Sequence, residues 1–213
     1  MINTVVITIK MISEKCTSNS WIEESAKNNK ADKILVQKLI RALILLEGLK
    51  ESGLGFAFKG GTALMLLLNS AKRLSIDIDI IVPDKTIEIE SLLNEIAIKK
   101  GFTRVKPIPR KAQTGIEKAH YEFIFPCSLR ANNEDYILLD ILFEKIHYST
   151  LISTPINSSF ITLDGEPLDV KTPDFNNIMG DKLTAFAPNT TGIPYFKKEK
   201  SMGQEIMKQL YDI

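Results

Sequence analysis

Isoleucine and aspartate alternate over residues 76–80, and this pattern constrains the fold more than any other feature of the chain. Successive side chains of a β-strand point to opposite faces, so the three isoleucines share one face and Asp77 and Asp79 share the other. We expect a strand that buries its isoleucines in a core. The two carboxylates indicate either a solvated strand face or a site for a divalent cation such as Mg²⁺, which prefers carboxylate oxygens.

A third acid, Asp140, lies within an apolar strand predicted for 136–143. A lone carboxylate among isoleucine and leucine side chains is costly unless it is paired or bound to a metal. If this strand neighbours residues 76–80, the three carboxylates converge. Two divalent ions held by them can activate an attacking oxygen and stabilise a leaving pyrophosphate.

A glycine pair precedes the acidic strand. Gly60 and Gly61 stand between a strand predicted at 56–58 and a helix predicted at 63–71. Bare backbone N–H groups at the positive end of a helix can hold a phosphate, and the Thr62 hydroxyl would add a donor. The alternative is a tight turn that needs glycine only for its conformation.

The rest of the chain predicts alternating helices and strands. Further helices are expected over 32–49, 88–100, from Pro173 to before Pro188, and 201–213. Further strands are expected over 4–9, 102–106 and 120–125, with 144–172 irregular apart from 160–163. The fold class predicted is α/β, in the α+β sense: a mixed sheet flanked by helices over residues 1–150, followed by a mainly helical segment over 151–213.

Composition excludes several classes of protein. The 213 residues include 27 Lys and Arg against 26 Asp and Glu, so no overall basic field exists to coat nucleic acid. Cys16 and Cys127 are too few for a disulfide scaffold, and His120 and His147 lack the spacing of zinc ligands. No leader peptide or membrane segment is expected, so the predicted location is cytoplasmic.

Two segments resemble the signature of the AbiEii/AbiGii-type nucleotidyltransferase toxins, within the polymerase-beta-like nucleotidyltransferase superfamily: FKGGTAL at 58–64 and RLSIDIDI at 73–80. GDKLTA at 180–185 resembles the family's third motif, and KQLYDI at 208–213 resembles its fourth. The resemblance covers about residues 50–213. Members of the family usually continue with a helical region, so we expect a C-terminal segment that is short or truncated.

The resemblance implies an NTP substrate, Mg²⁺ or Mn²⁺ as cofactor, and a set of site residues. Asp140 joins the set because of its strand. The candidates for catalysis are Asp77, Asp79, Asp140 and Asp212, the first three as metal ligands and the last as a general base. The candidates for nucleotide binding are Lys59, Gly60, Gly61, Thr62, Arg73, Ser75 and Lys182. The alternatives are a solvated helix lysine for Lys182 and a helix-surface acid for Asp212.

The implied activity is transfer of a nucleoside monophosphate to an acceptor hydroxyl, by the toxin of a toxin–antitoxin or phage-defence (abortive infection) system with an antitoxin partner. The expected acceptor is an RNA 3′ end such as that of tRNA. Residues 99–118 carry seven Lys or Arg and one Glu, which favours an RNA acceptor over a protein acceptor. The alternative for this stretch is a solvated helix end and loop. Two other functions stay open: a protein nucleotidylyltransferase (AMPylase-like), and an inactive protein that binds nucleotide or a partner.

Overall fold

The computed structural model describes residues 11–69, 73–84, 86–109, 117–188 and 190–212. The strand expected at 4–9 lies outside these residues. In the part of the chain that is described, no helix has both the length and the apolar character needed to cross a lipid bilayer.

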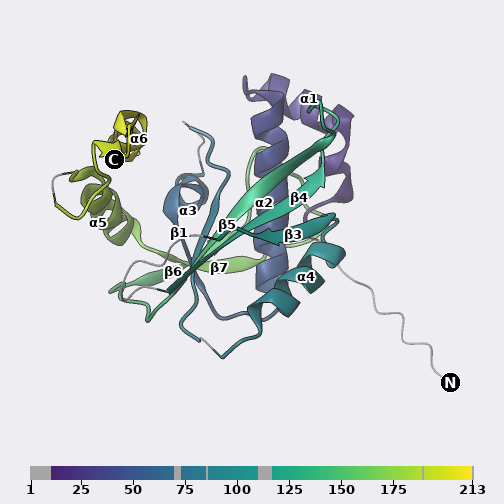
Figure 1. The fold of residues 1–213 in the computed structure, drawn as a ribbon. Helices are drawn as coiled ribbons and strands as arrows, with labels where there is room; N and C mark the ends of the chain where they lie inside the picture. The colour runs from purple at the N-terminus through teal and green to yellow at the C-terminus, as the bar shows by residue number, and fades with distance from the viewer. Residues whose placement is uncertain (1–10, 70–72, 85, 110–116, 189, 213) are drawn as a thin grey trace.

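A five-stranded mixed sheet forms the centre of the molecule (Figure 1). Its strands are β1 (Ala57–Lys59), β2 (Ile78–Ile81), β3 (Arg104–Pro107), β4 (Glu117–Pro126) and β5 (Glu134–Phe143), in the order β1-β2-β5-β4-β3. β2 and β5 pair in parallel, and the other neighbours in this sheet are antiparallel. The parallel pair sets Asp79 opposite Asp140, as the predicted convergence of carboxylates requires.

Two helices, α2 (Lys33–Glu51) and α4 (Ile89–Lys99), pack with the sheet to form the core (Figure 1). Ile78 and Ile80 are buried in this core, so the isoleucines of the alternating segment face inward as predicted. α2 begins where the Asp32 carboxylate accepts hydrogen bonds from the first free backbone N–H groups of the helix. α1 (Asn19–Asn28) and a short 3₁₀ helix (Glu14–Thr17) extend the same core.

The second half of the chain has more strand than its sequence predicts. β6 (Leu151–Pro155) and β7 (Asp169–Pro173) form an antiparallel pair within the segment expected to be irregular. In contrast, no strand forms at 160–163, where Leu163 makes only an isolated bridge to Ile12. The remaining elements are α5 (Phe175–Phe186), β8 (Phe196–Lys197), β9 (Lys200–Ser201) and α6 (Gly203–Tyr211).

The start of α5 differs from the prediction by two residues. Pro173 is the last residue of β7 rather than the first of the helix. Asp174 is the N-cap, and its carboxylate accepts a hydrogen bond from the backbone N–H of Asn177 at 2.9 Å. The strand extends to Pro173 because Leu151 of β6 pairs with it, and this partner is distant in sequence.

The basic stretch at 99–118 is largely paired with acids. Its ion pairs join Lys99 to Glu51, Lys100 to Glu47 and Glu51, Arg104 to Glu134, and Lys106 to Glu122. Arg110 and Lys111 lie outside the described residues. β3, which carries two of these cations, is at the edge of the sheet opposite β1. Acids therefore compensate part of the positive charge among the described residues of the stretch.

Gly48 provides a test of the helix packing. A Cβ at this position would lie 2.7 Å from Ile96 Cγ2 of α4, so Gly48→Ala must push the two helices apart. We expect a loss of about 1–2 kcal/mol in the free energy of unfolding, after allowing for the better helix propensity of alanine. Gly180→Ala in α5 is the control, because its Cβ meets no atom within 4 Å and should stabilise the protein slightly. Urea denaturation of both variants measures this, and equal effects would contradict the close contact of α2 with α4.

Candidate active site

A cleft of about 290 Å³ opens where the start of α3 (Gly60–Leu68) meets β2, α5 and α6. Its lining includes eight of the eleven predicted site residues: Lys59, Gly60, Gly61, Arg73, Ser75, Asp77, Asp79 and Lys182. The same cleft is lined by residues that sequence reasoning did not select: Asp181, Glu205, Lys208 and Gln209. Thr62, Asp140 and Asp212 do not line it.

The glycine turn packs directly against the acidic strand. Gly60 has φ +81°, and a Cβ there would collide with the carboxylate of Asp79. A Cβ at Gly61 would lie 2.6 Å from the Ser75 hydroxyl oxygen and 3.2 Å from Nη2 of Arg73. Both glycines are therefore required by close approach to the strand, and at Gly60 the left-handed backbone adds a second reason.

Thr62 has a different place from the one predicted. Its side chain is fully buried, and its hydroxyl donates a hydrogen bond to the backbone carbonyl of Asp77 at 2.7 Å. The hydroxyl faces the strand and not the cleft, so the predicted contact with phosphate has no support. Thr62 instead links the first turn of α3 to the backbone of Asp77.

Four ionisable side chains form a row across the sheet. Lys59, Asp79, Asp140 and His120 are successive register partners on β1, β2, β5 and β4. Register partners point to the same face of a sheet, so the row lies on the face opposite the buried isoleucines. His120 Nδ1 lies 2.5 Å from Oδ1 of Asp140, which gives this acid the partner that its apolar strand requires.

Loss of hydration perturbs the carboxylate of Asp79 on β2 and that of Asp77, which lies just before the strand. It raises the pKa of Asp79 from 3.8 to about 7, and the nearby charge of Asp140 adds to the increase, whereas Lys59 opposes it. The pKa of Asp77 is also raised, first by burial and then by Asp140. The protein alone therefore compensates these two negative charges incompletely.

The donor chemistry of this pair fits a divalent cation. Carboxylate oxygens are the ligands that Mg²⁺ and Mn²⁺ prefer, and Mg²⁺ usually takes its other ligands from waters and phosphates. Among the described residues, no three His, Cys, Asp or Glu side chains are grouped closely enough to hold a metal ion by themselves. The predicted three-carboxylate site is therefore not assembled by the protein alone, and Asp140 is engaged by His120.

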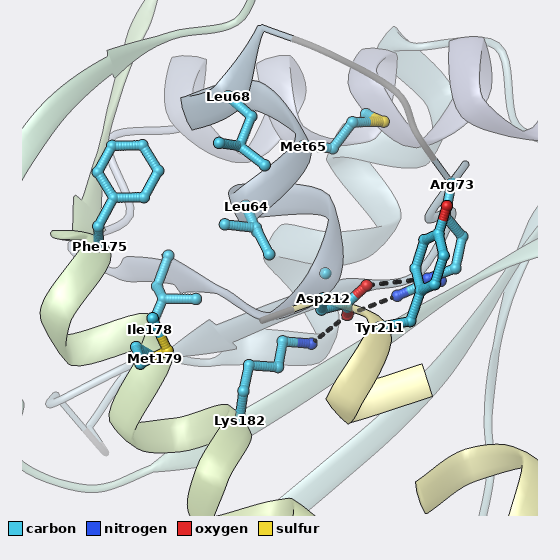
Figure 2. Close-up of a pocket in the computed structure, with 11 residues that line it drawn as sticks. Leu64, Met65, Leu68, Arg73, Phe175, Ile178, Met179, Lys182, Tyr211 and Asp212 are labelled. Carbon is cyan, nitrogen blue, oxygen red and sulfur yellow. Dashed lines mark hydrogen bonds and ion pairs between the residues drawn. The ribbon is translucent and has the colours of Figure 1, made fainter. Parts of the chain in front are cut away.

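A second group of charges, Arg73, Lys182 and Asp212, lies beside the cleft, and Figure 2 marks the interactions among them with dashed lines. Arg73 donates two hydrogen bonds to the Asp212 carboxylate, from Nε at 3.0 Å and from Nη2 at 2.7 Å. Lys182 Nζ donates to the same carboxylate at 2.8 Å. The Lys182 side chain is only 9% exposed and that of Asp212 7%, so neither is the solvated surface residue of the alternative interpretation.

The environment of Asp212 does not suit the general base predicted there. Burial alone would raise its pKa, but the hydrogen bonds from Arg73 and Lys182 outweigh burial and hold the pKa below its usual value. A carboxylate with a lowered pKa and both oxygens engaged is a weak proton acceptor. The geometry gives Asp212 another role, which is to hold Arg73 and Lys182 beside the cleft.

The chain matches the model of a family described as nucleotidyl transferase AbiEii toxin, type IV toxin–antitoxin system, over residues 44–213. The chain belongs to this family. The matched range includes the glycine turn, the acidic strand, Arg73, Lys182 and Asp212.

Solved structures resemble this AbiEii chain only distantly. JHP933 from Helicobacter pylori is 18% identical with a TM-score of 0.45, and the match covers 79% of this chain and 60% of that one. MenT4, a nucleotidyltransferase toxin from Mycobacterium tuberculosis H37Rv, is 15% identical with a TM-score of 0.45, and the match covers 78% and 59%. This chain thus spans about 60% of the length of these proteins. No curated protein matches it.

Sequence reasoning missed a pair of residues at the edge of the AbiEii cleft. The Tyr148 hydroxyl donates to Oδ2 of Asp181 at 2.6 Å, and Lys59 Nζ lies 3.6 Å from the same oxygen. Burial and then the hydrogen bond to Asp181 raise the pKa of Tyr148. Asp181 could have been predicted from the sequence, because it precedes Lys182 in the third motif. No sequence pattern near Tyr148 indicated a role for that residue.

The raised pKa of Asp79 predicts a stability that depends on pH. The pKa of Asp79 is about 7 in the native state and near 3.8 in the unfolded state, so between these pH values the native state binds more protons than the unfolded state. The contribution of Asp79 to the free energy of unfolding therefore falls as the pH rises from about 4 to about 7. Without divalent ions, Asp79→Asn should raise the melting temperature by several degrees near pH 7.5 and by almost nothing near pH 4. Asp169→Asn, an exposed acid of β7, is the control. A gain of equal size at both pH values would contradict the assignment.

The ion cluster predicts coupling between its members. Asp212→Ala leaves the buried Lys182 ammonium without its carboxylate, and should cost about 2–3 kcal/mol in the free energy of unfolding. The double variant Asp212→Ala with Lys182→Met removes the unpaired charge as well, and should recover part of this loss. Chemical denaturation of both single variants and the double variant measures the coupling. Strictly additive losses would show that the two side chains do not interact.

Proposed function

We propose that this chain transfers a nucleoside monophosphate from an NTP to an acceptor hydroxyl, with release of pyrophosphate. The observation that carries the proposal is the cleft in which the Gly60–Gly61 turn faces Asp77 and Asp79. Membership of the AbiEii family supports the same reaction class. The chemistry requires a phosphate site and an acidic site within one nucleotide's length, and the cleft offers both.

The triphosphate would lie over the start of α3. The backbone N–H groups of the first helical turn lack partners within the helix, and the positive end of the helix dipole adds to their attraction for phosphate. Lys59, Arg73, Lys182 and Lys208 also line the cleft and supply positive charge. The oxygens of a bound phosphate and those of Asp212 are all hydrogen-bond acceptors. Bound phosphate would therefore compete with Asp212 for the donors Arg73 and Lys182.

Asp77 and Asp79 would hold a divalent cation together with the phosphates. When bound, the cation neutralises charge that develops on the phosphates during transfer. The absence of a side chain at Gly60 leaves room for the Asp79 carboxylate, and the Thr62 hydroxyl holds the backbone of Asp77 by a hydrogen bond. Asp140, oriented by His120 on the same face, would be the third carboxylate.

The acceptor proposed is the 3′ hydroxyl of an RNA such as tRNA, and an antitoxin is the proposed protein partner. Support for both comes from the family. Ion pairs with acids weaken the electrostatic reason for preferring RNA over a protein hydroxyl, so the experiment needs an arm for each acceptor.

The decisive assay mixes the protein with each α-labelled NTP, Mg²⁺ or Mn²⁺, and total RNA. Label is expected in the tRNA band. Asp79→Asn should lower the rate at least about 100-fold, because even the outer partners of metal ligands contribute about 10- to 100-fold. Asp84→Asn, an exposed acid that follows the same strand, should keep the wild-type rate.

Two outcomes would redirect the proposal. Label that appears in the protein band and not in RNA would favour nucleotidylylation of a Ser, Thr or Tyr hydroxyl. Tight binding of NTP without transfer to either acceptor would favour the inactive, ligand-binding alternative.

A further inference from the structure

A small β-hairpin lies between α5 and α6 in the chain. Its strands β8 and β9 pair with each other in a two-stranded sheet that is separate from the central one. Residues 195–200 read YFKKEK, with two aromatic residues, three lysines and one glutamate. From the charge and exposure of this hairpin, we propose that it binds an unpaired strand of the acceptor RNA. This role rests on the proposed function, because it takes RNA to be the acceptor.

The lysines of the hairpin repel one another. Lys197 on β8 lies directly opposite Lys200 on β9, and like charges at opposite positions destabilise a strand pair. Both side chains are exposed, as is that of Lys198 in the turn. Within the described part of the chain, no ion pair joins any of the three to an acid. A phosphate beside the two opposed ammonium groups would relieve their repulsion, so the hairpin suits a phosphate backbone.

The hairpin differs in this respect from the basic stretch at 99–118, where several cations are paired with acids. Glu199 is the only acid in the hairpin sequence, so residues 195–200 keep a net positive charge. Lys198 has φ +56°, a left-handed conformation that a lysine rarely adopts, so the turn carries its charge at a conformational cost. Uncompensated lysines of this kind attract a polyanion by releasing its counterions.

Two aromatic side chains are exposed next to the lysines. Tyr195 is 53% exposed and Phe196 is 66% exposed. Exposed rings beside positive charge are typical of surfaces that bind single-stranded nucleic acid, because bases stack on the rings while the backbone follows the charge. A duplex hides the faces of its bases, so these rings favour an unpaired strand. Every base has a π face, so the contact should tolerate any sequence.

The base of the hairpin is bonded to elements that line the cleft. The backbone N–H of Ile193 donates to the carbonyl of Ala185 on α5 at 2.8 Å, and Ala185 lines the cleft. The backbone N–H of Met202 donates to the carbonyl of Tyr195 at 2.9 Å, and α6 begins at the next residue and contributes Glu205 to the cleft. A strand held by the hairpin therefore lies beside the helices of the cleft, where an acceptor hydroxyl is needed.

The first test changes the charge. Fluorescence anisotropy measures binding of a short unpaired RNA, without NTP, at several salt concentrations. Lys197→Glu with Lys200→Glu should weaken binding at least about 10-fold at low salt, and should lower the slope of log affinity against log salt by about 1.4, because each lost phosphate contact removes about 0.7. Lys27→Glu with Lys30→Glu is the control, because it changes the net charge equally at exposed positions near the end of α1, on the other side of the molecule from α5 and α6 (Figure 1). The control should leave affinity and slope unchanged.

The second test changes the rings. Tyr195→Ala with Phe196→Ala should weaken binding about 5- to 100-fold and leave the salt slope unchanged, because stacking releases no counterions. Tyr195→Phe with Phe196→Tyr exchanges the two rings and should keep the wild-type affinity. A duplex RNA of the same length should bind more weakly than the unpaired strand to wild-type protein.

The failures of this role and of the proposed function are distinguishable. If the hairpin variants bind RNA as the wild type does, or if the control on α1 weakens binding equally, the hairpin is not the RNA site. Equal binding of duplex and unpaired RNA would overturn the choice of an unpaired strand. If wild-type protein binds no RNA but transfers label to protein, the hairpin role is wrong and nucleotidyl transfer stands. If RNA binds through the hairpin and no label is transferred, the hairpin role stands and the proposed reaction is wrong.

Discussion

The close packing of the glycine turn against the acidic strand is the constraint on which the rest of the site depends. Gly60 leaves room for the Asp79 carboxylate and Gly61 leaves room for Ser75 and Arg73, so α3 can begin directly beside β2. Thr62 then fixes that approach with its hydrogen bond to the Asp77 backbone. A larger residue in the turn would move the positive end of α3 away from the carboxylates. The cleft would then no longer hold the phosphate site and the acidic site next to each other.

The cleft keeps its opposite charges apart. Asp77 and Asp79 remain incompletely compensated, as the raised pKa of each indicates. Arg73 and Lys182, only a short distance away, are paired with Asp212 instead. Because Arg73 and Lys182 are paired with Asp212, they do not form ion pairs with Asp77 or Asp79. The site thus retains a region that attracts cations next to one that attracts phosphate.

Local patterns were sufficient to predict part of this arrangement. The isoleucines of β2 repeat with the period of a strand, and Gly60 and Gly61 are adjacent in the sequence. The strand and the turn could therefore be predicted without knowing which segments pack against them. The pairing of His120 with Asp140 could not, because it depends on the register of β4 against β5. The roles of Thr62 and Asp212 were predicted from motif position, and their actual contacts follow from burial and from the docking of α6. The strands at 151–155 and 169–173 were missed because each needs the other to satisfy its backbone.

The contact between Arg73 and Asp212 also bears on how the protein folds. It joins residues separated by 139 positions, and the parallel pairing of β2 with β5 joins Asp79 to Asp140, which are 61 positions apart. Contacts of this kind form slowly, because the entropy of closing a long loop is lost before the contact contributes. During synthesis on the ribosome, the turn and the acidic strand are complete long before the carboxylate that organises the cations emerges. A nascent chain therefore carries an unfinished site until almost all of the residues described here have been made.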